Sequence, residues 1–585
     1  MKKRFLSCLM ALTLMGGTCF MSSCKNNSSY NADNFLPNGT AENPWQIVKD
    51  PISINIFVPV SNINPEYDTL AMFKTIERLT NIDITFTEAN VSAYENLRNM
   101  AWSDEKTRPD LFLFNNSVQE QVMYSKMKVI VPFNDPSFVT MTGVEAGNLI
   151  DNYMPNYKQL LDNNFGVEKG VGQTEATNAK EIATLDDGYM YSTLTVNTVP
   201  RDLTYKMYIN QSWIDNYNTY YAETGSELPN SDEIKTYEQL VDVLRAFKNY
   251  DVDRDGNNNN EIPVSSVGLK FLRNFVLQTC GYVSDSYEIN VLGDITAEES
   301  EFVYVPSTEQ YREYLRKMKQ LYAEKLLDNC FSSTDSSLVE KGSRLGMFQS
   351  AAPYLVVGKA HEKEYEVLSP LTSDYYSGIP VHLGFGSFMP IGAVIPTSTP
   401  YVREIARLLD LMYSDVGCQL IAYGEENVHW TWDDEEHTSW TFNVPDGWYE
   451  SGKTQEDYRA TLTPNVGTAN ALYWNYDFVG KMNDETIRTL NKMSETYTPY
   501  LKTPIPQEVK MTFDEYNTIA IYESTLNNFV TSAERYFIIG TEKNYDVESD
   551  ADWGKYLETL KGYRSEEMLN IYNNALTRYK AANKK

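Results

Sequence analysis

The chain has 585 residues, of which 42% are apolar and 13% aromatic, and it carries a formal net charge of −30. One hydrophobic core seldom organises a chain of this length, so we expect two or more domains. The negative charge argues against nucleic acid as a partner, and against binding of anionic membranes by the body of the protein, because polyphosphate surfaces require basic patches.

The start of the chain has the pattern of a bacterial secretion signal. Basic residues at positions 2–4 precede an apolar run over 5–20, which is too short and wrongly flanked for a permanent membrane span. Small residues before Cys24 resemble the lipobox of bacterial lipoproteins. We therefore predict a signal peptide over residues 1–23. Ordinary secretion, with cleavage nearby and no lipid, is the alternative.

Cleavage at this point would leave Cys24 as a lipidated amino terminus. The residues that follow, 24–44, are rich in Asn and Ser and would form a flexible tether. We then expect a lipid-anchored monomer at the extracellular face of the bacterial cell membrane.

From residue 52 the apolar pattern alternates between strands and helices. It predicts strands at 52–60, 82–88 and 110–114 and helices at 67–80 and 93–102. This β-α-β-α-β order is typical of a parallel sheet with helices on its faces. Ligands of such sheets gather at the carboxyl ends of the strands. The loops at those ends carry Asn62, Asn115 and Asn116, whose amides suit hydroxyl-rich ligands, although Asn after a strand is also ordinary turn chemistry.

A second set of elements follows an Asp-Gly turn at 187–188. Strands are predicted at 205–210, 344–348 and 393–395. Helices are predicted at 236–250, 269–280, 308–327, 400–414, 512–530, 552–560 and 565–580. The helix at 236–250 begins with a capping box from Thr236 to Gln239.

An acidic loop follows the helix at 236–250. Asp251, Asp253 and Asp255 alternate, and Gly256 permits a sharp turn at the sixth position. Alternate residues of a tightly wound loop point inward, so this spacing predicts a structural Ca²⁺ site. A solvated turn of Asp and Asn is the alternative.

Two registers fit the loop. The first starts at Asp251 and places an acid, Glu261, one position earlier than the usual twelfth. The second starts at Asp253 and continues through alternate residues to Glu261. The candidate ligands are Asp251, Asp253, Asp255, Asn257, Asn259 and Glu261.

Aromatic residues are dense beyond residue 429. Sugar rings present apolar C–H faces that stack on flat rings, while Asn, Asp and Glu bond the hydroxyls. Trp474, flanked by Asn470 and Asp477, is the preferred stacking residue, and the core face of a hairpin is the alternative role for Trp430 and Trp432. The candidate ligand contacts are Trp430, Trp432, Tyr473, Trp474 and Asp477.

Several segments carry a family resemblance. They are Tyr-Ile-x-x-x-Trp-Ile-Asp at 208–215, Leu-Arg-Ala-Phe-Lys at 244–248, Glu-Ile-Pro at 261–263, Tyr-Gly-x-Glu at 423–426 and Phe-Ile-Ile-Gly-Thr at 537–541. In this order the chain resembles the extracellular solute-binding proteins, family 1, of bacterial ABC importers. It is most similar to the large lipoprotein type associated with oligosaccharide uptake, over about residues 45–583.

The resemblance implies a two-lobed α/β fold, like that of periplasmic binding proteins, with a hinge between the lobes and a helical C-terminal segment. Residues 45–190 would begin lobe 1 and 191–375 would form most of lobe 2. Residues 376–585 would return to lobe 1 and add an aromatic-rich insert and C-terminal helices.

The resemblance also implies a function. Such a protein is not an enzyme: it captures an oligosaccharide between its lobes and delivers it to the transmembrane subunits of an ABC permease. Two alternatives are a peptide-binding surface lipoprotein and a secreted glycoside hydrolase. A hydrolase requires a fixed pair of carboxylates, and the sequence singles out none.

Overall fold

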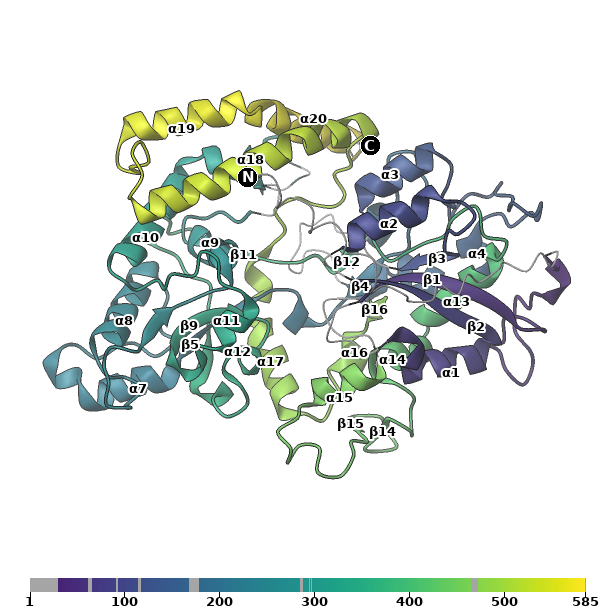
Figure 1. Cartoon of the computed structure of the whole chain (residues 1–585), viewed down its shortest axis with the longest axis horizontal. Coiled ribbons are helices and arrows are strands. Elements are labelled where there is room, and N and C mark those ends of the chain that lie inside the picture. Colours follow the sequence, from purple (N-terminus) through teal and green to yellow (C-terminus); the bar gives the residue numbers. More distant parts are fainter. Residues whose placement is uncertain are drawn as a thin grey trace, which may run out of the picture.

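The computed structural model describes residues 30–60, 66–90, 93–113, 117–167, 178–284, 288–293, 295, 297–463 and 472–583. Two α/β lobes lie side by side, one around β1 to β3 and the other around β5 and β9, with three long C-terminal helices across one end (Figure 1). No helix in these ranges is both long enough and apolar enough to span a membrane.

The first lobe is built on a four-stranded sheet in the order β13-β3-β1-β2. Its strands are β1 (Ile52–Val60), β2 (Ile82–Asn90), β3 (Leu111–Leu113) and β13 (Ala393–Val394). The three strands of the predicted β-α-β-α-β unit pair in parallel, as expected, and β13 joins β3 antiparallel at the edge. Ile54, Ile56 and Val58 are fully buried because helices cover the sheet.

The helices predicted at 67–80, 93–102 and 400–414 are present in this lobe, which also contains helices that were not predicted. The predicted helix at 67–80 starts with a 3₁₀ turn, Tyr67–Thr69, and becomes α-helical after Leu70, whose backbone is extended. The helices are α1 (Ala71–Thr80), α2 (Tyr94–Ser103), α3 (Val118–Lys126), α4 (Leu149–Tyr153), α5 (Pro155–Asp162), α6 (Ala179–Ala183), α13 (Val402–Tyr413) and α14 (Asp415–Tyr423).

The second lobe holds a mixed sheet in the order β10-β5-β9-β6. Its strands are β5 (Lys206–Asn210), β6 (Ile262–Val264), β9 (Leu345–Ser350) and β10 (Tyr365–Leu368), and a separate hairpin joins β7 (Ile289–Leu292) to β8 (Glu301–Tyr304). Its helices are α7 (Gln211–Tyr220), α8 (Tyr237–Asn249), α9 (Gly268–Gln278), α10 (Glu309–Ala323), α11 (Asp335–Val339) and α12 (Tyr354–Val357).

Two local predictions for the second lobe can be compared directly. The capping box between Thr236 and Gln239 is present at the start of α8. The helix predicted over 308–327 ends at Ala323, because Lys325 has a left-handed φ of +58° that a helix does not accommodate.

The aromatic-rich region extends below the first lobe and belongs to its core (Figure 1). It contains β14 (Trp430–Trp432), β15 (Trp440–Phe442), α15 (Gln455–Leu462), β16 (Tyr473–Trp474), α16 (Tyr476–Val479) and α17 (Glu485–Glu495). β16 pairs with β4 (Thr195–Asn197), which also pairs with β12 (Phe388–Met389).

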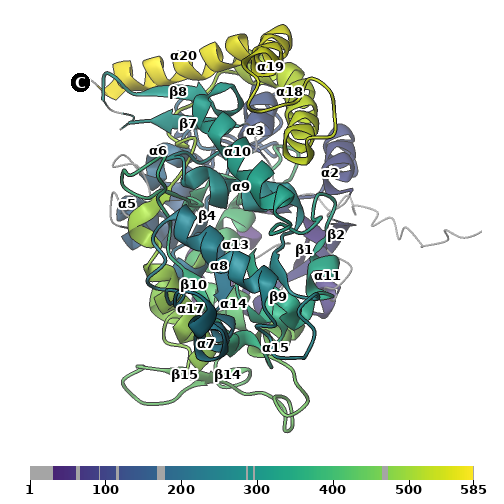
Figure 2. The same cartoon turned by 90° about the vertical axis from the view of Figure 1, so that its left-hand side faces the viewer.

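The three C-terminal helices are α18 (Phe513–Ile539), α19 (Asp550–Gly562) and α20 (Ser565–Asn583). The helix predicted to end at about residue 530 continues to Ile539 and stops at Gly540, whose left-handed φ is +70°. Figures 1 and 2 show α18 running from α3 of the first lobe to α10 of the second. Its first residues pack on the first lobe, and residues from Ile519 onward belong to the core of the second.

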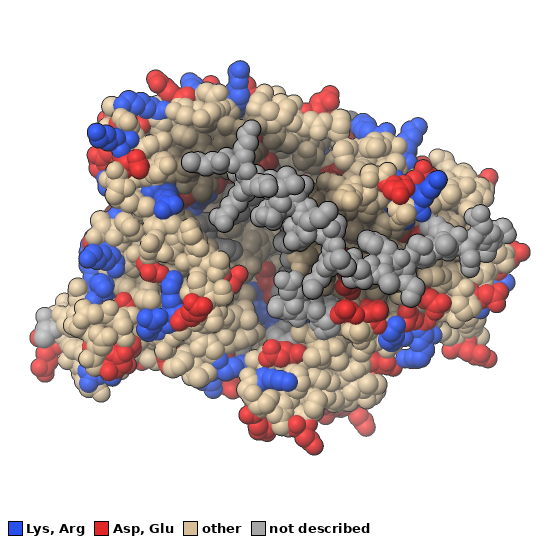
Figure 3. Space-filling view, viewed as in Figure 1, with Lys and Arg blue, Asp and Glu red and all other residues tan. Residues whose placement is uncertain are grey.

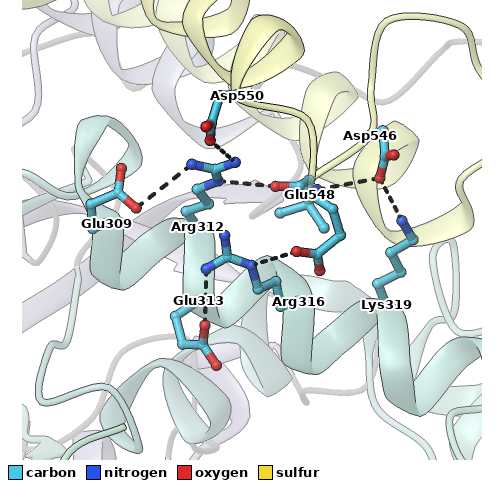
Figure 4. A network of polar contacts seen from close by, with 9 residues as sticks. Glu309, Arg312, Glu313, Arg316, Lys319, Asp546, Glu548 and Asp550 are labelled. Carbon is cyan, nitrogen blue, oxygen red and sulfur yellow. Dashed lines mark hydrogen bonds and ion pairs between the residues drawn. The ribbon is translucent and has the colours of Figure 1, made fainter.

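A row of ion pairs joins the α18–α19 loop and the first residue of α19 to α10 (Figure 4). Arg312 donates to Asp550 (2.8 Å), Arg316 to Glu548 (3.2 Å) and Lys319 to Asp546 (2.8 Å). The three basic residues lie on one face of α10, because they are separated by four and three positions.

Candidate binding site and cation site

Besides α18, three segments of the described chain cross between the lobes. The flanking residues Val196, Phe388 and Leu490 belong to the buried cluster that contains the first-lobe sheet and reaches Tyr208 and Phe348 of the second-lobe sheet. Met207, Leu371 and Val509 belong to the separate core of the second lobe. The crossings therefore lie within residues 197–206, 372–387 and 491–508. Since a relative movement of the lobes must bend these segments, they form the hinge.

Parts of the three crossings lie side by side, and we call residues 203–205, 382–385 and 501–503 the hinge ribbon. β11 (His382–Leu383) pairs in parallel with β17 (Leu501–Lys502). The amide of Gly384 donates to Lys502 O (3.0 Å), and the amide of Phe385 donates to Leu203 O (2.7 Å). Segments nearly 300 residues apart in sequence thus make one small sheet.

The ribbon has two faces. A Cβ added at Gly384 would meet the Cβ of Leu501 at 2.9 Å, so positions 384 and 501 face the same way. Side chains alternate along a strand, and Leu383 pairs with Lys502. Phe385 and Lys502 therefore lie on the opposite face from Leu501.

His382 lies on the buried face. Its Nδ1 bonds to Gln278 Oε1 (2.5 Å) and its Nε2 to the carbonyl of Tyr205 (3.0 Å), and its ring packs edge-on against Tyr497. Burial lowers the pKa of His382 to about 4, with the ammonium of Lys206 adding to the effect. The imidazole is therefore neutral at pH 7 and joins the second lobe to the ribbon.

The other face carries two exposed aromatic rings. Tyr205 is 38% and Phe385 39% exposed, and their rings meet edge to face with centroids 5.5 Å apart. Such rings offer flat apolar surface at the junction of the lobes. In the space-filling view the surface recedes between the lobes (Figure 3).

Lys502 supplies a cation on this face. Its side chain is partly buried, and burial lowers its pKa to about 8, which still leaves the ammonium mostly protonated at pH 7. No residue of the described ranges pairs with it through a carboxylate or a hydrogen bond from the ammonium.

The tryptophans predicted as ligand contacts have different surroundings. Trp430 is buried; its indole donates to Gly424 O (2.9 Å), and the rings of Phe478 and Trp440 pack against it. Trp430 therefore lies in the core of the hairpin, which was the alternative to a role in stacking on sugar. Trp432 is only partly buried, and His437 stacks on its ring at 4.3 Å.

The other aromatic candidates are also packed. Trp474 is 4% exposed, between the ring edge of Tyr423 and the guanidinium of Arg459, and Tyr473 packs on Phe165. Asp477 is exposed, in the first turn of α16. The structure thus brings these aromatic candidates into one cluster and leaves little ring surface open.

The remaining predictions fall elsewhere. Asn62, Asn115, Asn116 and Cys24 lie outside the described residues. The hinge ribbon was missed by sequence reasoning, because its strands are two residues long and carry no periodicity. An available signal was the clustering of small and aromatic residues in Gly384-Phe385-Gly386.

The acidic loop connects α8 to β6 and gathers carboxylates. One oxygen from each of Asp251, Asp253 and Asp255 lies within 4.8 Å of the others. The amide of Gly256 donates to Asp251 (3.1 Å) and that of Asp255 to Asp253 (3.1 Å), so the backbone winds around the acids. Gly256 has a φ of +91°, which glycine adopts without strain.

Four buried oxygens beside these acids accept no hydrogen bond of good geometry from the described residues. They are Asp251 Oδ1, Asn260 Oδ1 and both carboxylate oxygens of Glu261, which is only 4% exposed. Burial, with the charges of Asp253 and Asp251, raises the pKa of Glu261 to about 6. Buried acceptors without donors are costly unless a cation compensates them, and hard oxygen donors of this kind fit Ca²⁺.

The arrangement favours the register that starts at Asp251. In that register Gly256 is the sixth residue, and its amide binds the first acid. Asn257 and Asn259 are engaged inside the loop, since Asn257 Oδ1 accepts the amide of Asn259 (3.3 Å). Asn260, which the sequence analysis passed over, has an unpaired buried oxygen and donates to Asp255 (2.6 Å).

Comparison with known proteins supports the fold. No protein-family model matches the chain. The fructooligosaccharide ABC transporter substrate-binding protein FusA of Streptococcus pneumoniae is 22% identical over 587 residues, which cover 98% of each chain. The structure of FusA with kestose superimposes with a TM-score of 0.68 at 21% identity, over 91% of this chain and 100% of that one. FusA has also been solved as an EF-hand mutant.

More distant structures have the same fold. An HMO-binding, ABC-transporter-associated solute-binding protein from Bifidobacterium longum infantis gives a TM-score of 0.70 at 16% identity, covering 91% of this chain and 99% of its own. The alginate-binding protein AlgQ2 gives 0.64 at 16%, covering 92% and 100%. FusA and the HMO-binding protein are described as substrate- or solute-binding proteins of ABC transporters rather than as enzymes, in agreement with the prediction for this chain. The chain therefore has the two-lobed α/β fold of ABC-transporter substrate-binding proteins, the family that its sequence resembles.

Proposed function

We propose that this protein is the substrate-binding component of an ABC importer and binds an oligosaccharide between its two lobes. The observation that carries the proposal is the similarity to FusA over nearly the whole of both chains, in a structure that has two lobes joined by a hinge. Closure about the hinge ribbon would present the loaded protein to the permease.

The ligand would lie over the exposed face of the hinge ribbon. Tyr205 and Phe385 would stack on sugar rings, because both expose flat apolar surface where the lobes meet. Trp432, Asp477 and the loop amides Asn62, Asn115 and Asn116 remain candidate contacts. Trp430, Tyr473 and Trp474 would support the site from the core and would meet sugar only after a rearrangement of the rings around them.

Ca²⁺ would bind in the acidic loop and stabilise the second lobe. Support comes from the grouped carboxylates, the unpaired buried oxygens of Asp251 and Glu261, and the existence of an EF-hand mutant of FusA. The ion would be structural, since the loop lies between α8 and β6 and contributes nothing to the hinge ribbon.

Residues 1–23 would be removed as a signal peptide and Cys24 would carry lipid, which would anchor a monomer to the outer face of the cell membrane. Labelling with a radioactive fatty acid tests this directly. Wild-type protein should incorporate label and Cys24→Ser should not. Label that persists in Cys24→Ser would contradict the anchor without affecting the binding proposal.

A binding screen tests the proposed function. The protein without residues 1–25 is heated with a panel of oligosaccharides and short peptides, and each sugar is analysed afterwards by mass spectrometry. A ligand at about 100 times its Kd should stabilise the fold by roughly 2.7 kcal/mol, which is measurable as a rise in Tm. Intact recovery of a stabilising oligosaccharide is the expected result. Recovery of cleaved sugar would indicate a glycoside hydrolase instead, and stabilisation by peptides alone would indicate a peptide-binding lipoprotein.

A further inference from the structure

The hinge carries positive charge in a strongly acidic protein. The sequence holds 80 acidic and 50 basic residues, and many lysines pair with acids; Lys158 with Asp151 (2.6 Å) is one example. Lys502 differs from these lysines, because no described residue places a carboxylate within 4.0 Å of its ammonium. An ammonium that is partly desolvated and unpaired is costly, and it gains from a ligand that supplies the missing negative charge.

The surrounding charges do not neutralise it. Beneath the ribbon, Lys206 is fully buried and its ammonium donates to the carbonyls of Arg201 (2.7 Å) and Thr204 (3.3 Å). Asp202 is the acid that acts on Lys206, and it is already paired with Arg201 (3.3 Å). A second carboxylate, Asp335, acts on the neighbouring Tyr205 together with Asp202. The three cations Arg201, Lys206 and Lys502 thus stand against two carboxylates. The hinge therefore has a local excess of positive charge.

The ammonium lies on the same side of the ribbon as an aromatic surface. The pairing of Leu383 with Lys502, and the direction in which a Cβ at Gly384 would point, place Phe385 and Lys502 on the same face of the ribbon. The ring of Tyr205 packs against that of Phe385. A stacking ring beside a cation matches a sugar that presents an apolar face and, at its edge, an anionic substituent. A neutral sugar would offer the ammonium hydroxyl acceptors but no compensating negative charge.

We infer that the oligosaccharide bound by this protein is acidic, and that Lys502 pairs with its carboxylate or sulfate while Tyr205 and Phe385 stack on the sugar ring. This inference rests on the proposed function, and it adds the class of ligand and the residue that selects it.

The test measures Kd by titration calorimetry with matched pairs of oligosaccharides. One arm uses uronic-acid oligosaccharides and the same molecules after reduction of the carboxyl groups, which keeps length and linkage but removes charge. The other arm uses sulfated oligosaccharides and their desulfated forms. Together the arms tell which anion is recognised.

The wild-type protein should bind an acidic member at least tenfold more tightly than its neutral counterpart, because a hydrogen bond to a charged group is worth about one to two decades in affinity. Lys502→Met should lose about the same factor towards the acidic sugar and discriminate less than twofold. Lys502→Arg should retain most of the preference. Lys561→Met is the control, since it removes the same charge from an exposed surface pair on α19.

The outcomes separate this inference from the function on which it rests. Binding of a neutral oligosaccharide with a Kd unchanged in Lys502→Met would overturn the inference and leave the proposed function standing. An acidic ligand whose affinity is unaffected by Lys502→Met would overturn the assignment to Lys502. Failure of every oligosaccharide in both arms to bind would overturn the proposed function and the inference with it.

Discussion

Glu261 has an environment that suits a bound cation better than a proton. Its carboxylate is buried, accepts no hydrogen bond of good geometry although the backbone amides of Glu261 and Val252 lie nearby, and is close to the charges of Asp253 and Asp251. These effects raise its pKa from 4.5 to about 6, so without metal the folded state binds more protons than the unfolded state between these values. Stability of the metal-free protein should therefore rise as the pH falls from about 6 to 4.5.

Calcium should change that dependence. Protons and Ca²⁺ compete for the same oxygens, so the rise in Tm produced by Ca²⁺ should be large at pH 7 and small at pH 5. The measurement is a thermal melt at both pH values with Ca²⁺ or EDTA. Glu261→Gln should lose most of the Ca²⁺ response and the pH dependence of the metal-free protein in this window. An equal Ca²⁺ response in Glu261→Gln would show that Glu261 is not a ligand.

Phe385 should contribute to binding without contributing much to stability. Its ring is 39% exposed, and among the ring contacts of the described residues it makes only the edge-to-face contact with Tyr205. Phe385→Ala should weaken binding of the oligosaccharide found in the screen by about 1–2 kcal/mol, or roughly tenfold, because exposed aromatics at binding sites often act as hot spots. Calorimetry gives the affinity.

A buried ring provides the contrast to Phe385. Trp474→Ala should lower stability by about 3–5 kcal/mol, as expected for loss of a large core side chain. If Phe385→Ala left affinity unchanged, the exposed face of the hinge ribbon would not be the sugar platform.

At the scale of elements, α18 depends on a buried charge cluster. The carboxylate of Glu534 accepts two bonds from Arg273 of α9 (2.9 and 2.6 Å) and one from the hydroxyl of Tyr314 of α10. Glu288 binds the same guanidinium. Since all four residues are buried, loss of one partner leaves desolvated charge behind.

Glu534→Ala should therefore cost about 3–5 kcal/mol in the free energy of unfolding, measured by urea denaturation. The matched control is Glu548→Ala, which removes an exposed partner of Arg316 in the network of Figure 4. That change should cost less than about 1 kcal/mol, because surface ion pairs contribute little. Equal costs for the two variants would mean that the buried cluster does not fasten α18 to the second lobe.

Helices and strands with a strong local pattern could be predicted from the sequence, whereas the segments with which they pair or pack could not. The strand at 52–60 and the capped helices after Thr236 and Thr512 agree with the structure because apolar periodicity and capping are local. The pairing of Ala393 with Leu113 depends on distant chain, and the two-residue strands β11 and β17 have no period to detect. The candidate binding site shows the same limitation of sequence patterns. The high frequency of aromatic residues located the aromatic cluster, but it did not indicate which of the rings are exposed.

At the scale of the whole molecule, the cation loop and the hinge are separate. The acidic loop connects α8 to β6 within the second lobe, and β11 of the hinge ribbon lies between the lobes (Figure 1). No described residue of the loop hydrogen-bonds to the ribbon. Ca²⁺ can then stabilise one lobe without altering the surface that meets the ligand.

Metal removal should accordingly separate stability from affinity. EDTA should lower the Tm of the protein. Calorimetry performed well below that Tm should give a ligand Kd within about threefold of the value measured with Ca²⁺. Binding of Ca²⁺ can change the affinity for the ligand only if the two sites are in contact or both shift the same conformational equilibrium. Asp253→Asn, which weakens the cation site without a chelator, should behave in the same way. A tenfold or greater loss of affinity in both EDTA and Asp253→Asn would show instead that the loop controls the position of the second lobe at the hinge.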